Sequence, residues 1–222
     1  NVVKTIYAEW QNADQSIWEF RNTKDYFVFS KVMSWVALDR AAQIAALLGK
    51  TYYEQEWRQE ADRIYQDVLE KGWNEELQSF TQTYGGSEVD SSLLLMEYYN
   101  FIQPNDEKYV KTVQRIKKEL FNDGLMFRYK NKDDFGTPTS AFTICTFWMV
   151  RALYMTGSKD EAKTLFDQLL TYSNHVGLFS EDLDFKTKRQ LGNFPQAYSH
   201  LALIDTAALF TEERVLSKFI RP

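Results

Sequence analysis

The feature that most constrains the fold is the helical spacing of apolar residues along nearly the whole 222-residue chain. Apolar side chains recur every three or four residues, as expected of helices that bury one face. Convincing strands are missing, and the extended pieces near "SFTQTY" and "LMFRYK" are interpreted as parts of loops. The chain is therefore expected to be all-α. The pattern predicts eight helices, at residues 1–12, 29–49, 52–71, 88–101, 106–121, 140–156, 159–173 and 196–211.

Two properties alternate along these predicted helices. The connections after the second, fourth and sixth helices are tight, whereas the others have about 16–22 residues, a length typical of functional loops. The third, fifth and seventh helices are amphipathic and highly charged, as in "KYVKTVQRIKKELF", and the second, fourth, sixth and eighth are apolar around more of their circumference. A helix that is apolar nearly all round is buried, and one with a single apolar stripe lies outside.

The alternation predicts antiparallel hairpins of inner and outer helices, with all four long connections at one end. That end is the candidate functional face. Stacked hairpins form either an open solenoid or part of a closed double ring, and the lack of a fixed repeat period counts against the solenoid. A scaffold of tetratricopeptide type, suggested by "DEAKTLFDQLL", would have uniformly short loops, which this chain does not.

Composition excludes several classes of protein. The net charge is -5 with both signs mixed along the chain, so no basic stripe suggests a nucleic-acid partner. No apolar run approaches the roughly 18 residues of a membrane helix, and no signal peptide is recognisable. The single cysteine, Cys145, rules out a disulfide within the chain and is expected to be a buried free thiol. We expect one helical domain over residues 1–222, located in the cytoplasm.

Two of the long connections carry carboxylates suited to acid–base chemistry. Glu19 lies between two aromatic residues, and desolvation by aromatic surface raises the pKa of a carboxyl, as a general acid requires. The other connection carries Glu181, a candidate base, with Asp182 and Asp184 as competitors. The plainer alternatives are an exposed glutamate in the first loop and a calcium site or solvated acidic loop in the second. Because both loops share one face, they meet the minimum for glycoside hydrolysis.

The remaining long connections add polar and aromatic groups to this face. "FRYKNKDDFGTPTS" carries Arg128 and Tyr129, and such groups can bind sugar hydroxyls or stack on the apolar face of a sugar ring. Trp57 and Trp148 are expected in the core, and His200 is expected to be structural. Metal-ligand spacings, HExxH, a G-x-S-x-G elbow and a phosphate-binding loop are all missing from the sequence.

Several segments resemble the bacterial and archaeal glucoamylase-like enzymes of glycoside hydrolase family 15. They are "SIWEFR", "FSKVMSWVALDRA", "TICTFWMVRAL", "GLFSEDLDF" and "LGNFPQAYSHLALIDTAAL", and they run in order over nearly the whole chain. The resemblance implies an (α/α)6 barrel of six inner and six outer helices, of which about eight are expected here. It also implies inverting hydrolysis of α-glucosidic bonds in a disaccharide or oligosaccharide, from the non-reducing end, with no metal or organic cofactor.

The same resemblance implies roles for individual residues. The Glu of "IWE" matches the family's general acid, and the first Glu of "SED" matches its general base, which assigns Glu19 and Glu181. Arg128 and Tyr129 resemble the Arg-Tyr pair that contacts the sugar near the cleavage point. The full set of expected substrate-binding residues is Trp18, Arg21, Lys31, Trp35, Arg128, Tyr129 and Tyr198.

The chain also departs from the family pattern. Ser140 stands where relatives often have an acid, and the first four helices, with a Trp-Leu-Arg-Asp segment that grips the released sugar, have no counterpart. The chain is therefore expected to be the C-terminal two-thirds of a catalytic domain, inactive by itself. The alternative is a non-catalytic helical module that self-associates through surfaces the other helices would cover. The substrate stays open among maltooligosaccharide, isomaltose-type, dextran and trehalose.

Overall fold

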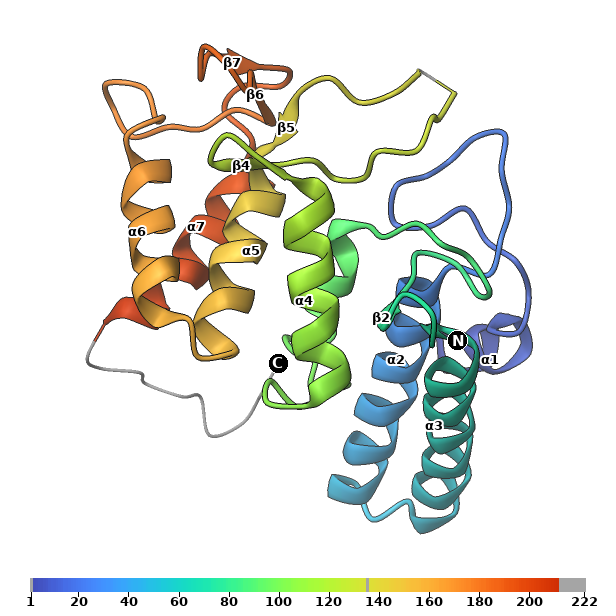
Figure 1. Ribbon diagram of the computed structural model, residues 1–222. Coiled ribbons are helices and arrows are strands. Elements are labelled where there is room, and N and C mark those ends of the chain that lie inside the picture. Colours follow the sequence, from blue (N-terminus) through green and yellow to red (C-terminus); the bar gives the residue numbers. More distant parts are fainter. Residues whose placement is uncertain (1, 135, 212–222) are drawn as a thin grey trace.

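The computed structural model describes residues 2–134 and 136–211, and within them the chain forms a row of helical hairpins (Figure 1). Seven of the eight predicted helices are confirmed in this part of the chain, with ends that shift by a few residues. The first prediction, 1–12, starts one residue outside the described chain. The α-helices are α1 (Val2–Glu9), α2 (Val28–Leu47), α3 (Thr51–Lys71), α4 (Glu107–Leu120), α5 (Thr143–Met155), α6 (Lys159–Leu170) and α7 (Ala197–Ala207).

The predicted helix at 88–101 is wrong in type. Only a short 3-10 helix, η1 (Ser91–Leu95), forms there, and turns follow it. The backbone bonds in this stretch span different distances along the chain: the amide of Tyr99 donates to Leu95 and that of Phe101 donates to Met96. The amide of Ser91 is also bonded to a carbonyl in another loop, so the segment is tied to its surroundings instead of to a regular helix. A second 3-10 helix, η2 (Ala208–Phe210), extends α7.

The long connections contain short antiparallel strands, where the sequence predicted only extended pieces of loop. Each has two residues, and they form two hairpins and one three-stranded sheet in the order β5-β6-β7. The pieces near "SFTQTY" and "LMFRYK" contain β2 and β4. The strands are β1 (Trp73–Asn74), β2 (Ser79–Phe80), β3 (Phe121–Asn122), β4 (Leu125–Met126), β5 (Ala141–Phe142), β6 (Asp182–Leu183) and β7 (Gln190–Leu191).

The predicted sorting of connections is confirmed. The tight turns after α2 and α5 lie at the lower end of the molecule in Figure 1, and the long connections around residues 10–27, 127–142 and 171–196 lie at the upper end. Helix α2 packs against α3, and α5 packs against both α6 and α7. The hairpin arrangement therefore gathers chemistry-bearing loops from distant parts of the sequence at one end.

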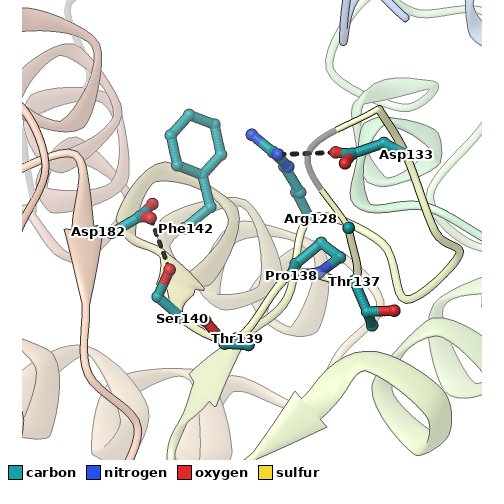
Figure 2. Close-up of a pocket in the computed structure, with 9 residues that line it drawn as sticks. Arg128, Asp133, Thr137, Pro138, Thr139, Ser140, Phe142 and Asp182 are labelled. Atoms are coloured by element: carbon teal, nitrogen blue, oxygen red, sulfur yellow. Dashed lines mark hydrogen bonds and ion pairs between the residues drawn. The ribbon is translucent and has the colours of Figure 1, made fainter. Parts of the chain in front are cut away.

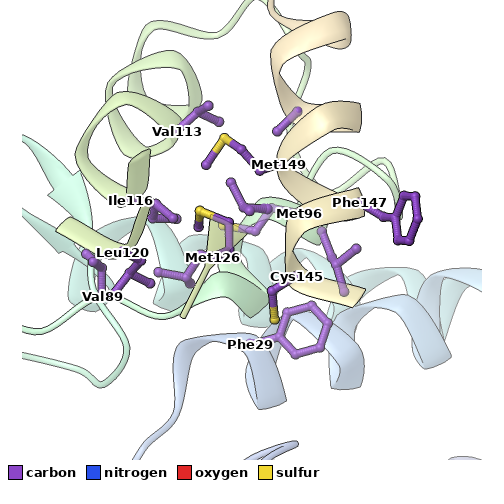
Figure 3. Close-up of a cluster of buried hydrophobic side chains, with 14 of the residues drawn as sticks. Phe29, Val89, Met96, Val113, Ile116, Leu120, Met126, Cys145, Phe147 and Met149 are labelled. Carbon is purple, nitrogen blue, oxygen red and sulfur yellow. The ribbon is translucent and has the colours of Figure 1, made fainter. Parts of the chain in front are cut away.

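Helix α5 lies at the centre of the core. Nine of its thirteen residues are buried, and its side chains meet residues of α2, α4 and η1 in a cluster that is rich in sulfur (Figure 3). Met96 and Met126 pack there with Met149 of α5, and methionine is suited to filling irregular gaps between helices. Cys145 is buried and free, as expected, and burial raises the pKa of its thiol.

Helix α7 differs from the inner helix that its composition predicted. Only three of its residues are buried, and the apolar side chains of Tyr198, Leu201 and Ile204 are exposed along one face. An apolar helix face of this kind is an unpartnered surface in the described structure. No helix among the described residues is both long and apolar enough to cross a bilayer.

Helix α2 offers a matched test of this core. Leu38 is fully buried, whereas Leu47 on the same helix is 85% exposed. We expect Leu38→Ala to lower the free energy of unfolding by about 2–5 kcal/mol, because the truncation loses buried contacts and leaves a cavity. Leu47→Ala should change it by less than about 0.5 kcal/mol. Urea denaturation followed by tryptophan fluorescence measures both, and equal effects would contradict the packing described.

Candidate functional site

A cleft of about 690 Å³ opens where the long loops meet the upper ends of α5 and α7. Five residues that the sequence assigned to one site line it together: Trp18, Glu19, Arg128, Glu181 and Tyr198. They come from three different long connections and from the first turn of α7. The hairpin arrangement has thus brought the two proposed catalytic carboxylates to the same cavity.

Glu19 lies on a tight turn that aromatic side chains anchor on both sides. Its backbone is left-handed, with φ 55°, and the amide of Phe20 donates to Gln15 across the turn. Trp18 and Phe20 both pack against Tyr129, with ring centroids 5.8 and 5.1 Å away. The side chain of Glu19 lines the cleft and is exposed to solvent in the described structure. The described chain therefore does not enclose this carboxyl in aromatic surface as the sequence predicted.

Glu181 is held in place by the loop that follows β7. Its carboxylate oxygen Oε2 accepts hydrogen bonds from the backbone amide of Asn193 at 3.1 Å and from the side-chain Nδ2 of the same residue at 2.8 Å. Gly192 makes this approach possible, because its φ is 73° and a Cβ there would lie 2.9 Å from Oε2. The main chain of Glu181 also bonds to Thr143 at the start of α5.

The neighbouring Asp182 points into a different pocket. This smaller pocket, of about 200 Å³, lies beside the main cleft and is lined by Arg128, Asp133, Phe142 and residues of the preceding loop (Figure 2). Ser140 donates a hydrogen bond of 2.6 Å to the Asp182 carboxylate. Burial raises the pKa of Asp182, although the bond from Ser140 opposes that shift. The side chains of Glu181 and Asp182 thus line different pockets, and Glu181 faces the cavity that contains Glu19.

Arg128 lines both cavities and lies over the ring of Tyr129, 4.9 Å from its centroid. Its guanidinium is 3.2 Å from the carboxylate of Asp133, which also accepts a hydrogen bond of 2.5 Å from the hydroxyl of Tyr129. Tyr129 itself is buried, and burial raises the pKa of its hydroxyl. Tyr129 therefore supports the floor beneath Trp18, while Arg128 presents hydrogen-bond donors to the cavities.

Of the expected substrate-binding residues, Tyr129 does not line the cleft because it is buried, and three more also lie elsewhere. Trp35 is buried in the core, where its ring meets Tyr65 and Phe101. Lys31 is buried below the loop, its ammonium 2.5 Å from the carbonyl oxygen of Asn12, and burial lowers its pKa. Arg21 is largely exposed and pairs with Asp134 instead of lining the cleft. These residues lie in or near the first long connection in the sequence, but that position did not predict where their side chains point.

Sequence reasoning missed one wall of the cleft. Ile144, Trp148 and Arg151 line it, although Trp148 was expected in the core. These positions are four and three residues apart on α5, so they share one helix face, and that spacing could have identified them. Tyr98 lies at the same end, with the Arg151 guanidinium 4.6 Å from its ring centroid. His200 is structural, as expected, since it accepts a hydrogen bond from the backbone amide of Phe179.

No group of three or more His, Cys, Asp or Glu side chains able to hold a metal ion occurs in the described residues. The carboxylates of residues 181–184 instead accept hydrogen bonds from nearby residues. Asp184 accepts bonds from Thr187, and these lower its pKa. The cleft as a whole is lined by carboxylates, among them Glu19 and Glu181, by two arginines, Arg128 and Arg151, and by several aromatic rings. Such groups can bind and cleave a glycoside.

Comparison with known proteins shows that the chain is similar to part of several trehalases. The chain is 41% identical over 212 residues to a trehalase of Thermoplasma volcanium, covering 95% of this chain and 34% of that protein. It is 42% identical over 206 residues to a trehalase of Mycobacterium tuberculosis, covering 91% of this chain and 30% of that one. The chain thus spans about one third of the length of these curated relatives.

Solved structures show the same fold. A wild-type glycosidase superposes with a TM-score of 0.78 at 20% identity, covering 93% of this chain and 58% of the other. A bacterial glucoamylase complexed with acarbose superposes with a TM-score of 0.78 at 15% identity, covering 93% and 36%. The described helices therefore form part of an (α/α)6 toroid. The model for glycosyl hydrolases family 15 matches residues 1–168 and 156–208, so the chain belongs to that family.

Proposed function

We propose that this chain carries the catalytic carboxylates of an enzyme that hydrolyses α-glucosidic bonds with inversion. Glu19 is the general acid and Glu181 the general base. The observation that carries the proposal is that both line one cleft although they come from opposite ends of the chain. Family membership supports the reaction class, since members of this family hydrolyse glycosidic bonds.

The reaction needs one proton donor and one proton acceptor. Glu19 gives its proton to the glycosidic oxygen as the bond to the anomeric carbon breaks. Glu181 takes a proton from a water molecule that attacks this carbon from the opposite side, so the product has the inverted configuration. Inversion of this kind works with carboxyl groups about 6.5–9.5 Å apart, because the water lies between the base and the sugar. Arg128 and the aromatic rings bind the sugar hydroxyls and ring faces.

The surroundings of Glu181 suit the role of base better than those of Asp182. Within the described residues, both hydrogen bonds to the Glu181 carboxylate use Oε2, and Oε1 is left to hold a water. The carboxylate of Asp182 is instead bonded to Ser140, and Asp182 lines the neighbouring pocket.

Trehalose is the substrate that the comparisons favour. The curated relatives with about 41% identity are named trehalases, whereas the glucoamylases share only the fold at lower identity. Trehalose joins two glucose units through both anomeric carbons, so its cleavage needs the same acid and base as other α-glucosides. We therefore propose trehalose as the first substrate and maltooligosaccharides as the second to be tested.

The alternative is a helical module that associates with other chains. The exposed apolar side chains of Tyr198, Leu201 and Ile204 on α7 support it, as do Leu47 and Leu48 at the far end of the row. Association through such a surface does not require catalysis. The convergence of carboxylates, Arg128 and aromatic rings on one cleft favours the enzyme, because a docking surface has no need of that combination.

Removing either carboxyl tests the proposal directly. In the full-length protein, Glu19→Gln and Glu181→Gln should each lower the turnover of trehalose by about 10²–10⁴-fold, the usual contribution of a general acid or base. NMR of the first product formed by the unchanged protein should show β-glucose from the inverted unit. Glu76→Gln, an exposed glutamate near β1, serves as the control and should leave turnover unchanged. Normal turnover in either of the first two variants contradicts the assignment.

The choice between Glu181 and Asp182 has its own test. We expect Asp182→Asn to keep trehalose turnover within about tenfold of normal, because Asp182 faces the smaller pocket, whereas Glu181→Gln loses the larger factor of a missing base. Azide added to a glycine or alanine variant at the true base position restores turnover by supplying the nucleophile. Rescue of Asp182→Ala and not of Glu181→Ala would reverse the assignment.

The 222-residue chain by itself is expected to hydrolyse p-nitrophenyl α-glucoside slowly or not at all. Glu19 and Tyr198 are exposed in the described structure, so the cleft encloses a sugar ring on only part of its surface. Activity is measured by the release of nitrophenol, and sedimentation of the same sample reports self-association. Turnover equal to that of the full-length protein would overturn this expectation, and large assemblies without turnover would favour the interaction module.

A further inference from the structure

Asp90, at the end of the long connection before η1, is a buried carboxylate with an unusual set of partners. It is 2% exposed, and its Oδ2 accepts a hydrogen bond of 2.6 Å from the indole Nε1 of Trp18. Ser92 donates a bond of 2.6 Å to its other oxygen, and Gln82 donates a third at 3.3 Å. Burial raises the pKa of Asp90, while these hydrogen bonds oppose that shift. Burying a carboxylate costs free energy that hydrogen bonds must offset, so a buried carboxylate with three side-chain partners calls for a structural or functional reason.

The bond to Trp18 joins two segments that are far apart in sequence. Around the indole, the rings of Tyr129, Phe142 and Trp148 lie 5.8, 6.1 and 6.3 Å away, so the ring is held between aromatic surfaces. Aromatic contacts hold the ring at this depth but allow it to slide or turn. A hydrogen bond has a preferred direction, so the bond to Asp90 selects one orientation.

The orientation of Trp18 bears directly on the next residue, Glu19. The two share a peptide bond within a turn that is closed by the amide of Glu19 donating to the carbonyl of Ser16 at 3.1 Å. With Phe20 packed on the other side, Glu19 has little freedom to move independently of its neighbours. A displacement of the Trp18 ring therefore displaces the Glu19 carboxyl.

We propose that Asp90 is a positioning residue, which acts through the Trp18 indole to place the Glu19 carboxyl for proton transfer. The proposal rests on the assignment of Glu19 as general acid. Asp90 itself does not line the cleft and so acts only through Trp18. The adjacent Ser91 strengthens the role of this segment, since its amide and hydroxyl bond to the carbonyl oxygens of Arg128 and Phe127. The same short segment thus holds the acid loop and the arginine loop in register.

The test compares two alanine variants in the full-length protein. Asp90→Ala removes the acceptor of the indole N–H. Ser92→Ala removes a hydrogen bond of the same length to the same carboxylate but leaves the bond to Trp18 intact. We expect Asp90→Ala to lower kcat for trehalose by about 10- to 100-fold, as a misplaced catalytic group does, with KM little changed. Ser92→Ala should keep normal kcat, and equal kcat in the two variants would overturn the proposal.

The leaving group separates positioning of the acid from general damage. Fluoride departs without a proton, so α-glucosyl fluoride depends far less on a general acid than trehalose does. Asp90→Ala should therefore retain turnover of the fluoride within about threefold of normal. Equal losses on both substrates would show that Asp90 acts on the fold as a whole and would overturn the proposal. Asp90→Asn should recover most activity on trehalose, because the amide oxygen can accept the indole N–H.

A second route covers an Asp90→Ala protein that does not fold. Replacing Trp18 by benzothienylalanine exchanges the indole N–H for sulfur and nearly preserves the ring shape. The same selective loss on trehalose is expected, and normal turnover on both substrates would overturn the proposal. Glu19→Gln distinguishes a failure of the proposed function from a failure of the proposed role of Asp90. If Glu19→Gln retains normal trehalose turnover, the proposed function fails; if it loses turnover while the indole replacement does not, only the role of Asp90 fails.

Discussion

An antiparallel helical hairpin returns the chain to the end at which it started, and the rest of this structure depends on that constraint. Tight turns join α2 to α3 and α5 to α6 at one end, so every longer connection must begin and finish at the other. Residues separated by most of the chain therefore meet at that end, while the helices between them in sequence pack against one another. The cleft is a direct result, because its lining comes from loops at both ends of the chain.

Around that cleft, the side chains that line the cavity and the side chains that support them are distinct groups. Glu19, Glu181 and Arg128 reach the cavity, whereas Tyr129 and Asp90 lie below it and hold their neighbours. Support comes through directional bonds between loops, such as indole to carboxylate and hydroxyl to carboxylate. Loops have little regular backbone bonding of their own, so these side-chain bonds give them a defined shape. This explains why buried polar residues collect beneath the site.

Much of the fold followed from the period of the apolar pattern. Seven helices, the tight and long connections and the gathering of long loops at one end were all predictable, because they depend on local spacing and on hairpin topology. The segment at 88–101 was not, since its backbone is tied by Ser91 to another loop and only a short 3-10 helix forms there. An apolar pattern records that a segment is buried but not which backbone bonds it makes once it is there.

By itself the sequence determined the helical class, the two acidic loops and, through its motifs, the family. Which of the aromatic and basic residues reach the cleft was decided by tertiary packing, because composition is the same for a ring in the core and a ring in a cavity. Trp35 turned inward against Tyr65 and Phe101, while Trp148 turned toward the site. Only the folded chain could bring Asp90 to the indole of Trp18, since a contact between distant loops leaves no local pattern for the sequence to show.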